Sequence, residues 1–364
     1  MKKRMVSLVL ALVLAVGLLS MTVYADWNSF RGNDGNNMAI VDAQTPVDKN
    51  FTRLSWAATI GTLPGKDTVY VSQPVLSGNY IYAVAGTKLY KLSTDDGSIE
   101  KEVTLEGTDS YGLTQPAISD DLIIIALNDG RILAYDKDSL ELQWRYDGVS
   151  GEQGASPVLV SDGRIYTGFW KSETGEAHFV CLNMSGELQW RHTQKGGFYW
   201  AGAVAVGDYV FVGTDDGEAK EVSGTSYILS FEKASGKQGA KLELKNYGDV
   251  RSSLAYANGR IYFTTKGGYL CSAAVDGKTG AITGLQKLEN KIEGAVCEST
   301  STPVVYDGYI YYGVGKTKGY FVIAKESENK SLEIAKTVEL KGRSQGSALL
   351  TTAYLDADKK SGNL

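Results

Sequence analysis

The stretch SPVLVSDGRIYTGFWKSETGEAHFVCLNMSGELQW, residues 156–190, contains four short runs in which apolar and polar residues alternate. Alternation with a period of two indicates half-buried β-strands. Asp162-Gly163 separates the first two runs, and this dipeptide favours a two-residue hairpin turn. A second turn signal at Ser185-Gly186 precedes the closing run GELQW. The stretch therefore predicts four successive antiparallel strands.

The same pattern recurs along the chain. The residue that ends the apolar pair after the first turn is found at six positions: Tyr82, Ile124, Tyr166, Phe211, Tyr262 and Tyr311. The spacings between them are 42, 42, 45, 51 and 49 residues. Four short strands in a repeat of roughly 40–50 residues are typical of a β-propeller blade. No amphipathic helical pattern interrupts the strands, which excludes a parallel α/β sheet.

These repeats predict an all-β fold, a β-propeller of four-stranded blades. Six full repeats span about residues 73–340, and a partial seventh spans 343–364. We expect seven blades, with eight as the alternative, in a propeller domain that covers residues 26–364. The partial seventh repeat lacks its middle strands, so we interpret the C-terminus as truncated.

Leu54-Ser55-Trp56 has the sequence of a blade end but precedes the first blade. Its echoes, Leu142-Gln143-Trp144 and Leu188-Gln189-Trp190, close the second and third repeats. We therefore expect residues 54–56 to be the outermost strand of the last blade, with Trp56 packed against the neighbouring blade. Pairing of this strand with the C-terminal strands would close the ring and remove open sheet edges.

The first 25 residues have the pattern of a secretory signal peptide. Lys2, Lys3 and Arg4 precede an uncharged apolar run, and Val23-Tyr24-Ala25 fits a cleavage site. An uncleaved membrane anchor is the alternative. Cleavage leaves 34 basic and 42 acidic residues, which moves the net charge from −5 to about −8. We expect a secreted or extracytoplasmic, monomeric protein that has no membrane span after cleavage and binds no nucleic acid.

Two segments carry a family resemblance. DWNSFRGNDGNN at 26–37 resembles the lead-in of pyrroloquinoline-quinone-like propellers, and FVCLNMSGELQW at 179–190 resembles their repeat. The resemblance implies a quinoprotein-like propeller. This group includes quinone- and calcium-dependent dehydrogenases, whose chemistry uses an Asp base and often two adjacent cysteines, and the non-catalytic lipoprotein scaffold of the outer-membrane barrel-assembly machine. The chain has no adjacent cysteines, so the resemblance favours the non-catalytic scaffold.

The residues that commonly carry chemistry are scarce. The chain has two histidines, His178 and His192, without metal-ligand spacing, and three cysteines that do not form a disulfide scaffold. We expect Cys181 and Cys271 to be packing residues. Acidic runs such as GTDDGE at 213–218 do not complete a calcium-binding loop and fit turns. No metal, cofactor or catalytic residue is predicted.

The loops that join one blade to the next gather on one face of a propeller, around the channel. Five residues in these loops are candidates for ligand binding: Tyr199, Trp200, Arg251, Glu298 and Arg343. The aromatic run in GGFYWAG, residues 196–202, offers a stacking platform, or alternate members pack between blades. The arginines, in the parallel contexts DVRSS and KGRSQ, could clamp a carboxylate or pair with Glu298 or Asp249.

Two functions from different classes remain open. The favoured hypothesis is an exported, non-enzymatic propeller that binds a protein, peptide or glycan on its channel face, with a scaffold or adhesion-like role at the cell envelope. The alternative is a pyrroloquinoline-quinone-dependent dehydrogenase. Fold alone does not decide between them.

Overall fold

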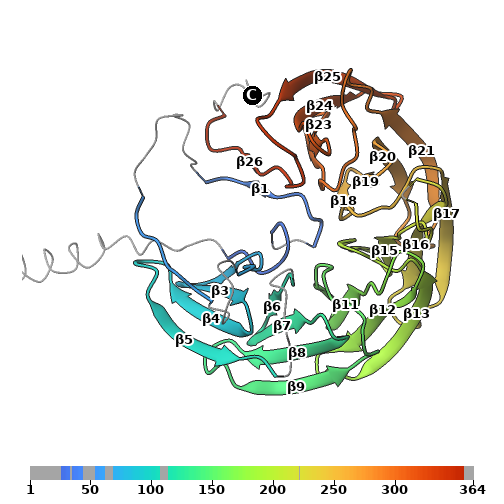
Figure 1. Ribbon diagram of the computed structural model, residues 1–364. Helices are drawn as coiled ribbons and strands as arrows, with labels where there is room; N and C mark the ends of the chain where they lie inside the picture. Colours follow the sequence, from blue (N-terminus) through green and yellow to red (C-terminus); the bar gives the residue numbers. More distant parts are fainter. Residues whose placement is uncertain are drawn as a thin grey trace, which may run out of the picture.

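The computed structural model describes residues 26–32, 35–43, 54–61, 69–106, 114–220 and 222–355. Within these ranges every regular element is a β-strand, and no helix is present. They form six four-stranded sheets, arranged as blades around a central axis, and one two-stranded sheet (Figure 1). The predicted all-β propeller with four antiparallel strands per repeat is confirmed.

Each blade uses four consecutive strands, in order from the channel outward. The first two blades are β2 (Val75–Ser77), β3 (Tyr80–Ala85), β4 (Lys88–Ser93), β5 (Ile99–Thr104), and β6 (Ala117–Ser119), β7 (Leu122–Ala126), β8 (Arg131–Asp136), β9 (Leu142–Asp147). The next two are β10 (Leu159–Ser161), β11 (Arg164–Gly168), β12 (Glu176–Asn183), β13 (Leu188–Lys195), and β14 (Val204–Val206), β15 (Tyr209–Gly213), β16 (Thr225–Glu232), β17 (Gln238–Lys245). The last two are β18 (Ala255–Ala257), β19 (Arg260–Thr264), β20 (Tyr269–Val275), β21 (Ile282–Glu289), and β22 (Val304–Tyr306), β23 (Tyr309–Val314), β24 (Tyr320–Glu326), β25 (Leu332–Glu339).

The hairpin signals read from the sequence are the turns between the first two strands of each blade. Asp162 and Gly163 both have positive φ, 51° and 68°, which matches the right-handed twist of the flanking strands. Asn258-Gly259 and Asp307-Gly308, in the fifth and sixth blades, also have positive φ at both residues. Two consecutive left-handed residues thus set the register of β10 against β11, where Leu159 pairs with Tyr166.

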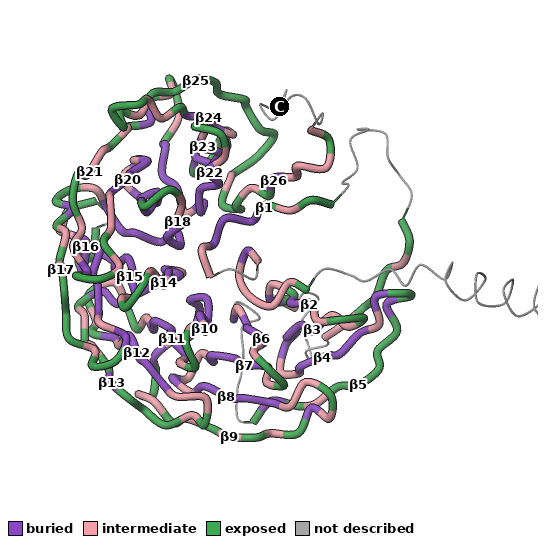
Figure 2. The backbone as a smooth tube through the Cα atoms, turned by 180° about the vertical axis from the view of Figure 1, so that it is seen from behind, coloured by how far each residue is buried: buried purple, intermediate pink, exposed green. Residues whose placement is uncertain are grey.

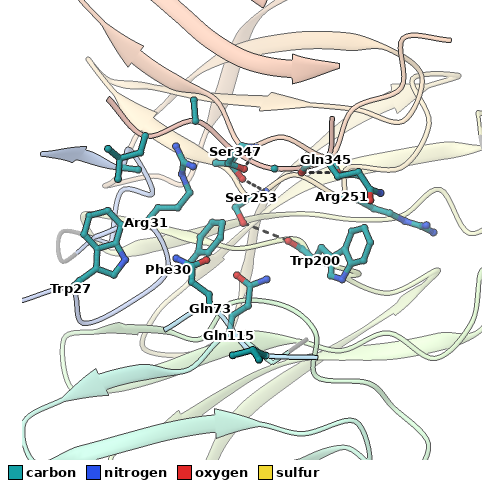
Figure 3. A pocket seen from close by; sticks show the side chains of 17 residues that line it. Trp27, Phe30, Arg31, Gln73, Gln115, Trp200, Arg251, Ser253, Gln345 and Ser347 are labelled. Atoms are coloured by element: carbon teal, nitrogen blue, oxygen red, sulfur yellow. Dashed lines mark hydrogen bonds between the residues drawn. The ribbon is translucent and has the colours of Figure 1, made fainter. Parts of the chain in front are cut away.

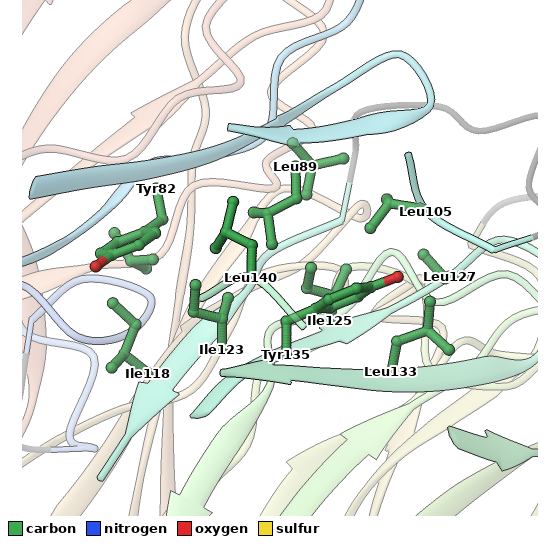
Figure 4. Packing of buried hydrophobic residues seen from close by; sticks show 12 residues of the cluster. Tyr82, Leu89, Leu105, Ile118, Ile123, Ile125, Leu127, Leu133, Tyr135 and Leu140 are labelled. Atoms are coloured by element: carbon green, nitrogen blue, oxygen red, sulfur yellow. The ribbon is translucent and has the colours of Figure 1, made fainter. Parts of the chain in front are cut away.

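The hydrophobic core lies between blades rather than inside any one of them. Figure 4 shows the interface of the first two blades, where Tyr82 and Leu89 pack on Ile123 and Tyr135 (Figure 4). Burial is greatest along the inner and middle strands, and the outermost strands face solvent (Figure 2). Each blade is thus stabilised mainly by its neighbours, so an apolar residue on either face of a middle strand is buried.

An N-terminal segment crosses the middle of the ring and is bonded to the inner strands of several blades (Figure 1). Trp27 and Leu76 exchange backbone hydrogen bonds of 2.8 and 2.9 Å. Two further backbone bonds, at 2.6 and 2.9 Å, run from Ile118 N to Asn28 O and from Tyr256 N to Asn36 O. The first, second and fifth blades are therefore tied together through residues that lie outside the repeats.

The Asn37 side chain connects this segment to two further carbonyl groups of the ring. Its Nδ2 donates to two carbonyl oxygens, Ala203 O at 3.0 Å and Leu254 O at 2.8 Å, which precede the inner strands of the fourth and fifth blades. Asn37 is buried, with φ 58°, a conformation that asparagine tolerates better than most residues. Arg31, also buried, donates from Nε to Asn37 O at 2.8 Å.

The N-terminal segment also meets the C-terminal part of the ring. β1 (Ile40–Val41) pairs in parallel with β26 (Leu350–Thr351), in the sector that follows the sixth blade. An N-terminal strand therefore joins the last blade position, as expected for ring closure. The strand is β1, however, because residues 54–56 are not in a strand. Trp56 packs against the first blade, which follows the last blade position in the ring, as predicted, and its indole Nε1 donates to Thr94 O.

The signal peptide expected at 1–25 lies outside the described residues. Among the residues that are described, no helix reaches the length and apolar character of a membrane span. Cys181, Cys271 and Cys297 are free and buried, and the first two lie in the interblade cores, as predicted.

Candidate ligand-binding face around the channel

A pocket of about 480 Å³ lies at the mouth of the channel, on the face where the interblade loops meet (Figure 3). Trp27, Phe30, Arg31 and Ala39 of the N-terminal segment line part of it. Its walls are amide, hydroxyl and aromatic side chains from several blades, among them Gln73, Gln115, Trp200, Ser253, Thr302 and Gln345. The pocket is therefore mostly neutral and suited to hydrogen bonding and stacking.

A chain of hydrogen bonds fixes one side of the pocket. Gly202 N donates to Ser253 Oγ at 3.1 Å, and Ser253 N donates to Thr302 Oγ1 at 3.1 Å. Thr302 N in turn donates to Ser347 Oγ at 2.8 Å. Each bond crosses from one blade to the next, so these hydroxyl residues occupy equivalent repeat positions. Ser347 thereby marks the start of the seventh inner strand.

This register corrects one alignment made from the sequence. Because Ser253 and Ser347 are equivalent, the residue that corresponds to Arg251 is Gln345 and not Arg343. Arg251 and Gln345 both line the channel-mouth pocket. The contexts DVRSS and KGRSQ look alike, but two extra residues separate the arginine from the hydroxyl in the second one.

The aromatic run at 198–200 divides between the core and the face. Phe198 is fully buried against Phe179, with ring centroids 5.4 Å apart. The Tyr199 ring stacks on Trp200, with centroids 4.6 Å apart, and its centroid also lies 4.7 Å from that of Trp170. Trp200, with φ 60°, turns its ring into the pocket wall. One member thus packs between blades, while Trp170, Tyr199 and Trp200 form a short aromatic stack.

Arg251 lies among three carboxylates. Its Nη2 is 2.7 Å from Asp215, 3.1 Å from Asp249 and 2.5 Å from Glu173. The guanidinium also lies over the Tyr199 ring, with Cζ 5.1 Å from the ring centroid. Arg251, Asp215 and Asp249 are all buried. The sequence-based alternative in which Arg251 pairs with Asp249 is therefore confirmed, and the arginine holds three loops together.

The electrostatics of this cluster follow from burial. Burial raises the pKa of Asp249 to about 6, although the nearby Arg251 opposes the shift. Burial also raises the pKa of Asp215 well above its ordinary value, again against the effect of Arg251. Burial alone would lower the pKa of Arg251, but Asp215 and Asp249 outweigh it and the net shift is upward. One cation thus faces more carboxylate charge than it neutralises.

Glu298 and Arg343 belong to a second group of charges on the same face. Glu298 is buried and lies 3.1 Å from Lys266, 3.4 Å from Lys316 and 4.0 Å from Arg343. Arg343 is about half exposed. Pairing between these two candidates, the alternative considered from the sequence, is therefore present. Glu298 lines a separate surface pocket and does not reach the channel mouth.

Sequence reasoning did not single out Asp215 and Glu173. Asp215 was interpreted as one acid of a turn in GTDDGE, yet its side chain is fully buried. One signal could have found it: Thr214 and Asp215 directly follow the buried strand β15, on the same side of the blade as the loop that carries Arg251. Glu173 lies in the long connection between β11 and β12, where no periodicity indicates its direction.

The profile of one protein family, described as outer membrane protein assembly factor BamB, matches residues 45–174 and again 175–327. These two matches cover most of the chain. The chain belongs to this family. Membership agrees with the quinoprotein-like resemblance of the repeats and with the propeller just described. No match was found among curated protein sequences.

Solved structures show the same fold at low identity. A europium-containing methanol dehydrogenase has a TM-score of 0.70 at 11% identity, over 90% of this chain and 81% of its own. BamB from Moraxella catarrhalis has a TM-score of 0.52 at 16% identity, over 74% of this chain and 75% of its own. A quinohemoprotein alcohol dehydrogenase from Comamonas testosteroni has 0.66 at 12%, over 92% and 70%. These likenesses establish the fold.

The carboxylates that surround Arg251 do not form an open cation site. The carboxylates of Glu173, Asp215 and Asp249 lie within 4.8 Å of one another, as cation ligands do. The guanidinium of Arg251 contacts all three. A cation at their centre would have to displace a buried arginine that holds three loops. The cluster is therefore a structural ion-pair network in this chain.

Proposed function

We propose that this chain is a non-enzymatic β-propeller of the cell envelope that binds a polypeptide ligand at the channel mouth. The observation that carries the proposal is the composition of the pocket. Its two charged side chains, Arg31 and Arg251, are both held by groups of the protein itself. The rest of the lining consists of glutamine amides, hydroxyl groups, aromatic rings and small or aliphatic residues such as Val71 and Leu349, which suit the amide groups and side chains of an extended peptide.

The family supports the same conclusion. Its name describes an assembly factor for outer membrane proteins, and an assembly factor must hold another polypeptide. A role of this kind requires a rigid, exposed binding face rather than a poised acid or base. The hydroxyl chain from Ser253 to Ser347 supplies rigidity, and the stack of Tyr199 and Trp200 supplies an amphipathic anchor of the kind enriched at interfaces.

Trp200, Tyr199 and Arg343 are assigned different roles in this proposal. Trp200 would contact the ligand directly, with Tyr199 holding its ring by stacking. Arg343, half exposed, would attract acidic groups of the ligand at the rim. Arg251 and Glu298 are buried and ion-paired, so they would shape the face without leaving their partners.

A binding assay with two arms tests the proposal. The purified chain is applied to peptides taken from outer-membrane β-barrel proteins and, separately, to cell-wall glycans. We expect peptide binding that Trp200→Ala weakens at least about tenfold, the loss of one well-packed aromatic contact. Thermal unfolding should remain unchanged. Gln345→Ala should weaken binding, whereas Gln189→Ala, on the exposed outer strand β13, serves as the matched control.

Three results would overturn the proposal. Binding of glycans but not of peptides would show that the ligand is a glycan and not a polypeptide. Binding that Trp200→Ala and Gln345→Ala leave unchanged would remove the channel mouth as the binding face. Reduction of a dye with alcohols or sugars, after addition of pyrroloquinoline quinone and calcium, would show the dehydrogenase activity that the ion-paired Arg251 cluster argues against.

A further inference from the structure

Two arginines line the channel-mouth pocket, Arg251 and Arg31, and they differ in their partners. Arg251 contacts three carboxylates. Arg31 is equally buried, with 5% exposure, and among the described residues it donates to carbonyl oxygens: from Nε to Asn37 O at 2.8 Å and from Nη2 to Met38 O at 3.5 Å. These carbonyl groups hold the side chain in place, but they carry no formal charge that would balance its own.

The electrostatics of the two arginines differ in the same way. Burial lowers the pKa of Arg31 to about 10. The pKa of Arg251 is raised, because Asp215 and Asp249 outweigh the effect of burial. A carboxylate beside Arg31 would shift its pKa upward in the same manner. A buried cation without a balancing anion is costly, so an anion that enters the pocket next to Arg31 would be stabilised there.

The pocket also supplies hydrogen-bond donors for such an anion. A guanidinium has five N–H groups, and the described residues accept from two of its nitrogens, Nε and Nη2. The hydroxyl oxygens of Thr302 and Ser347 each accept a backbone N–H, which leaves the hydroxyl hydrogens for a ligand. Arg31, Thr302 and Ser347 all line the pocket (Figure 3). A carboxylate accepts strong hydrogen bonds from groups of these kinds.

The rest of the lining favours a carboxylate that is attached to an apolar group. Among the described residues that line the pocket, none is acidic, so a bound carboxylate meets no like charge in the wall. Val71 and Leu349 also line the pocket and are about half exposed. A ligand side chain that covers them would remove apolar surface from water. The same pocket therefore offers a buried cation and, beside it, an apolar contact.

We infer that the channel mouth binds a carboxylate group of its ligand, through the guanidinium of Arg31 and the hydroxyl groups of Thr302 and Ser347. This inference rests on the proposed function and names the chemical group by which the polypeptide is held. The C-terminus of a chain is the source that the lining favours, because a terminal carboxylate directly adjoins a side chain that can reach Val71 and Leu349. An acidic side chain is the other source of the same group.

Three peptides distinguish these sources. The first has about ten residues, no acidic side chain, a C-terminal leucine and a free terminal carboxylate. The second is its C-terminal amide, and the third is the amide with one internal glutamate. Isothermal titration calorimetry on the parent chain should show that the acid binds at least about tenfold more tightly than the neutral amide, the effect of hydrogen bonds to a charged group. Binding of the glutamate amide more tightly than the acid would identify a side chain as the source.

Two variants test the assigned residues. Arg31→Gln should bring the ratio of acid to amide affinity close to one, and Ser347→Ala, at an exposed position, should lower that ratio at least about threefold without altering a buried group. Arg145→Gln, at a half-exposed arginine of the outer strand β9, is the control and should keep the ratio of the parent. Thermal unfolding verifies that each variant is folded. The comparison of acid and amide on the parent chain does not depend on any variant.

The outcomes separate this inference from the proposed function. Equal binding of acid and neutral amide by the parent chain would overturn the inference and leave peptide binding at the channel mouth intact. No binding of any of the three peptides would overturn both. A preference for the acid that a folded Arg31→Gln variant retains would also overturn the inference, by showing that another cation holds the carboxylate.

Discussion

Trp56 donates a hydrogen bond from its indole Nε1 to the carbonyl oxygen of Thr94, at 2.9 Å. Trp144 bonds Met184 O at 2.9 Å, and Trp190 bonds Lys233 O at 3.0 Å. In each case the acceptor lies in the turn before the outermost strand of the following blade. Trp56, which precedes all six blades in the chain, therefore makes the same contact with the first blade that Trp144 makes with the third.

Truncation of Trp56 should destabilise the protein. Trp56→Ala removes a half-buried ring and a hydrogen bond, for an expected loss of about 2–3 kcal/mol in the free energy of unfolding. Trp56→Phe should cost about 1 kcal/mol, because mainly the hydrogen bond is lost. Urea unfolding measures both, and Trp144→Ala, the equivalent residue of the second blade, is the reference. A Trp56→Ala variant as stable as the parent would contradict the assignment.

The contact between Trp56 and the first blade also predicts the effect of adding a methyl group to the first blade, at Gly97. Gly97 has φ +73°, and a Cβ there would lie 2.3 Å from Cε3 of Trp56. Gly97→Ala should cost about 2–4 kcal/mol, from the strained backbone and the collision. In a Trp56→Ala background the collision disappears and the cost should fall to about 1 kcal/mol. Gly78→Ala, at φ +56° in open space, isolates the backbone contribution. Equal costs in both backgrounds would exclude the contact.

Asn37 should be sensitive to a change of one atom. Asn37→Asp keeps the shape and the tolerance for positive φ, but replaces two donated hydrogen bonds with an oxygen that faces the carbonyls of Ala203 and Leu254. We expect a loss of about 3–5 kcal/mol at neutral pH, since a buried charge loses its partners. Asn36→Asp is the control for the adjacent position. Proteolysis within 26–41 should accelerate in Asn37→Asp alone, and unchanged protection would contradict this role.

The Arg251 cluster predicts a dependence of stability on pH. The pKa of Asp249 is raised to about 6 by burial, so the folded state holds a proton that the unfolded state releases between pH 4 and 6. The free energy of unfolding therefore falls as the pH rises through this window, by up to about 3 kcal/mol. Asp249→Asn removes the titration, so its thermal midpoint should change less between pH 5 and 7 than that of the parent. An identical change in both proteins would contradict the raised pKa.

The fold was predictable because its information is periodic. Turn pairs such as Asp162-Gly163 and the recurring position of Tyr166 repeat often enough to define the blade from one chain. The path of residues 26–41 was not predictable, because a segment that contacts four different blades has no period of its own. The assignment of residues 54–56 was half right: the motif identified the packing of the Trp56 side chain on the next blade, but not a backbone pairing, for which the sequence holds no separate signal.

The sequence predicted on which face of the propeller the candidate residues lie, but not which of them form ion pairs with one another. Trp200 and Arg251 were placed correctly on the loop side, since blade order alone decides which loops meet there. The partners of Arg251 lie 36 and 78 positions away, at Asp215 and Glu173, and a turn acid resembles a buried acid in sequence. Arg343 was aligned with Arg251 by similar local context, whereas the hydroxyl register aligns Gln345 with Arg251. Glu298 was selected only as a residue of an interblade loop.

The pairing of Ile40 with Leu350 has a consequence for the order of folding. These residues are 310 positions apart in the chain, whereas the strands within a blade are joined by short hairpins. Synthesis begins at the N-terminus, so successive blades can stack as they are made. During this time β1, which will pair with β26, remains unpaired. Ring closure is then the last and slowest step, because contacts between distant residues form late. Until that step the backbone groups of β1 lack the strand with which they pair in the folded ring.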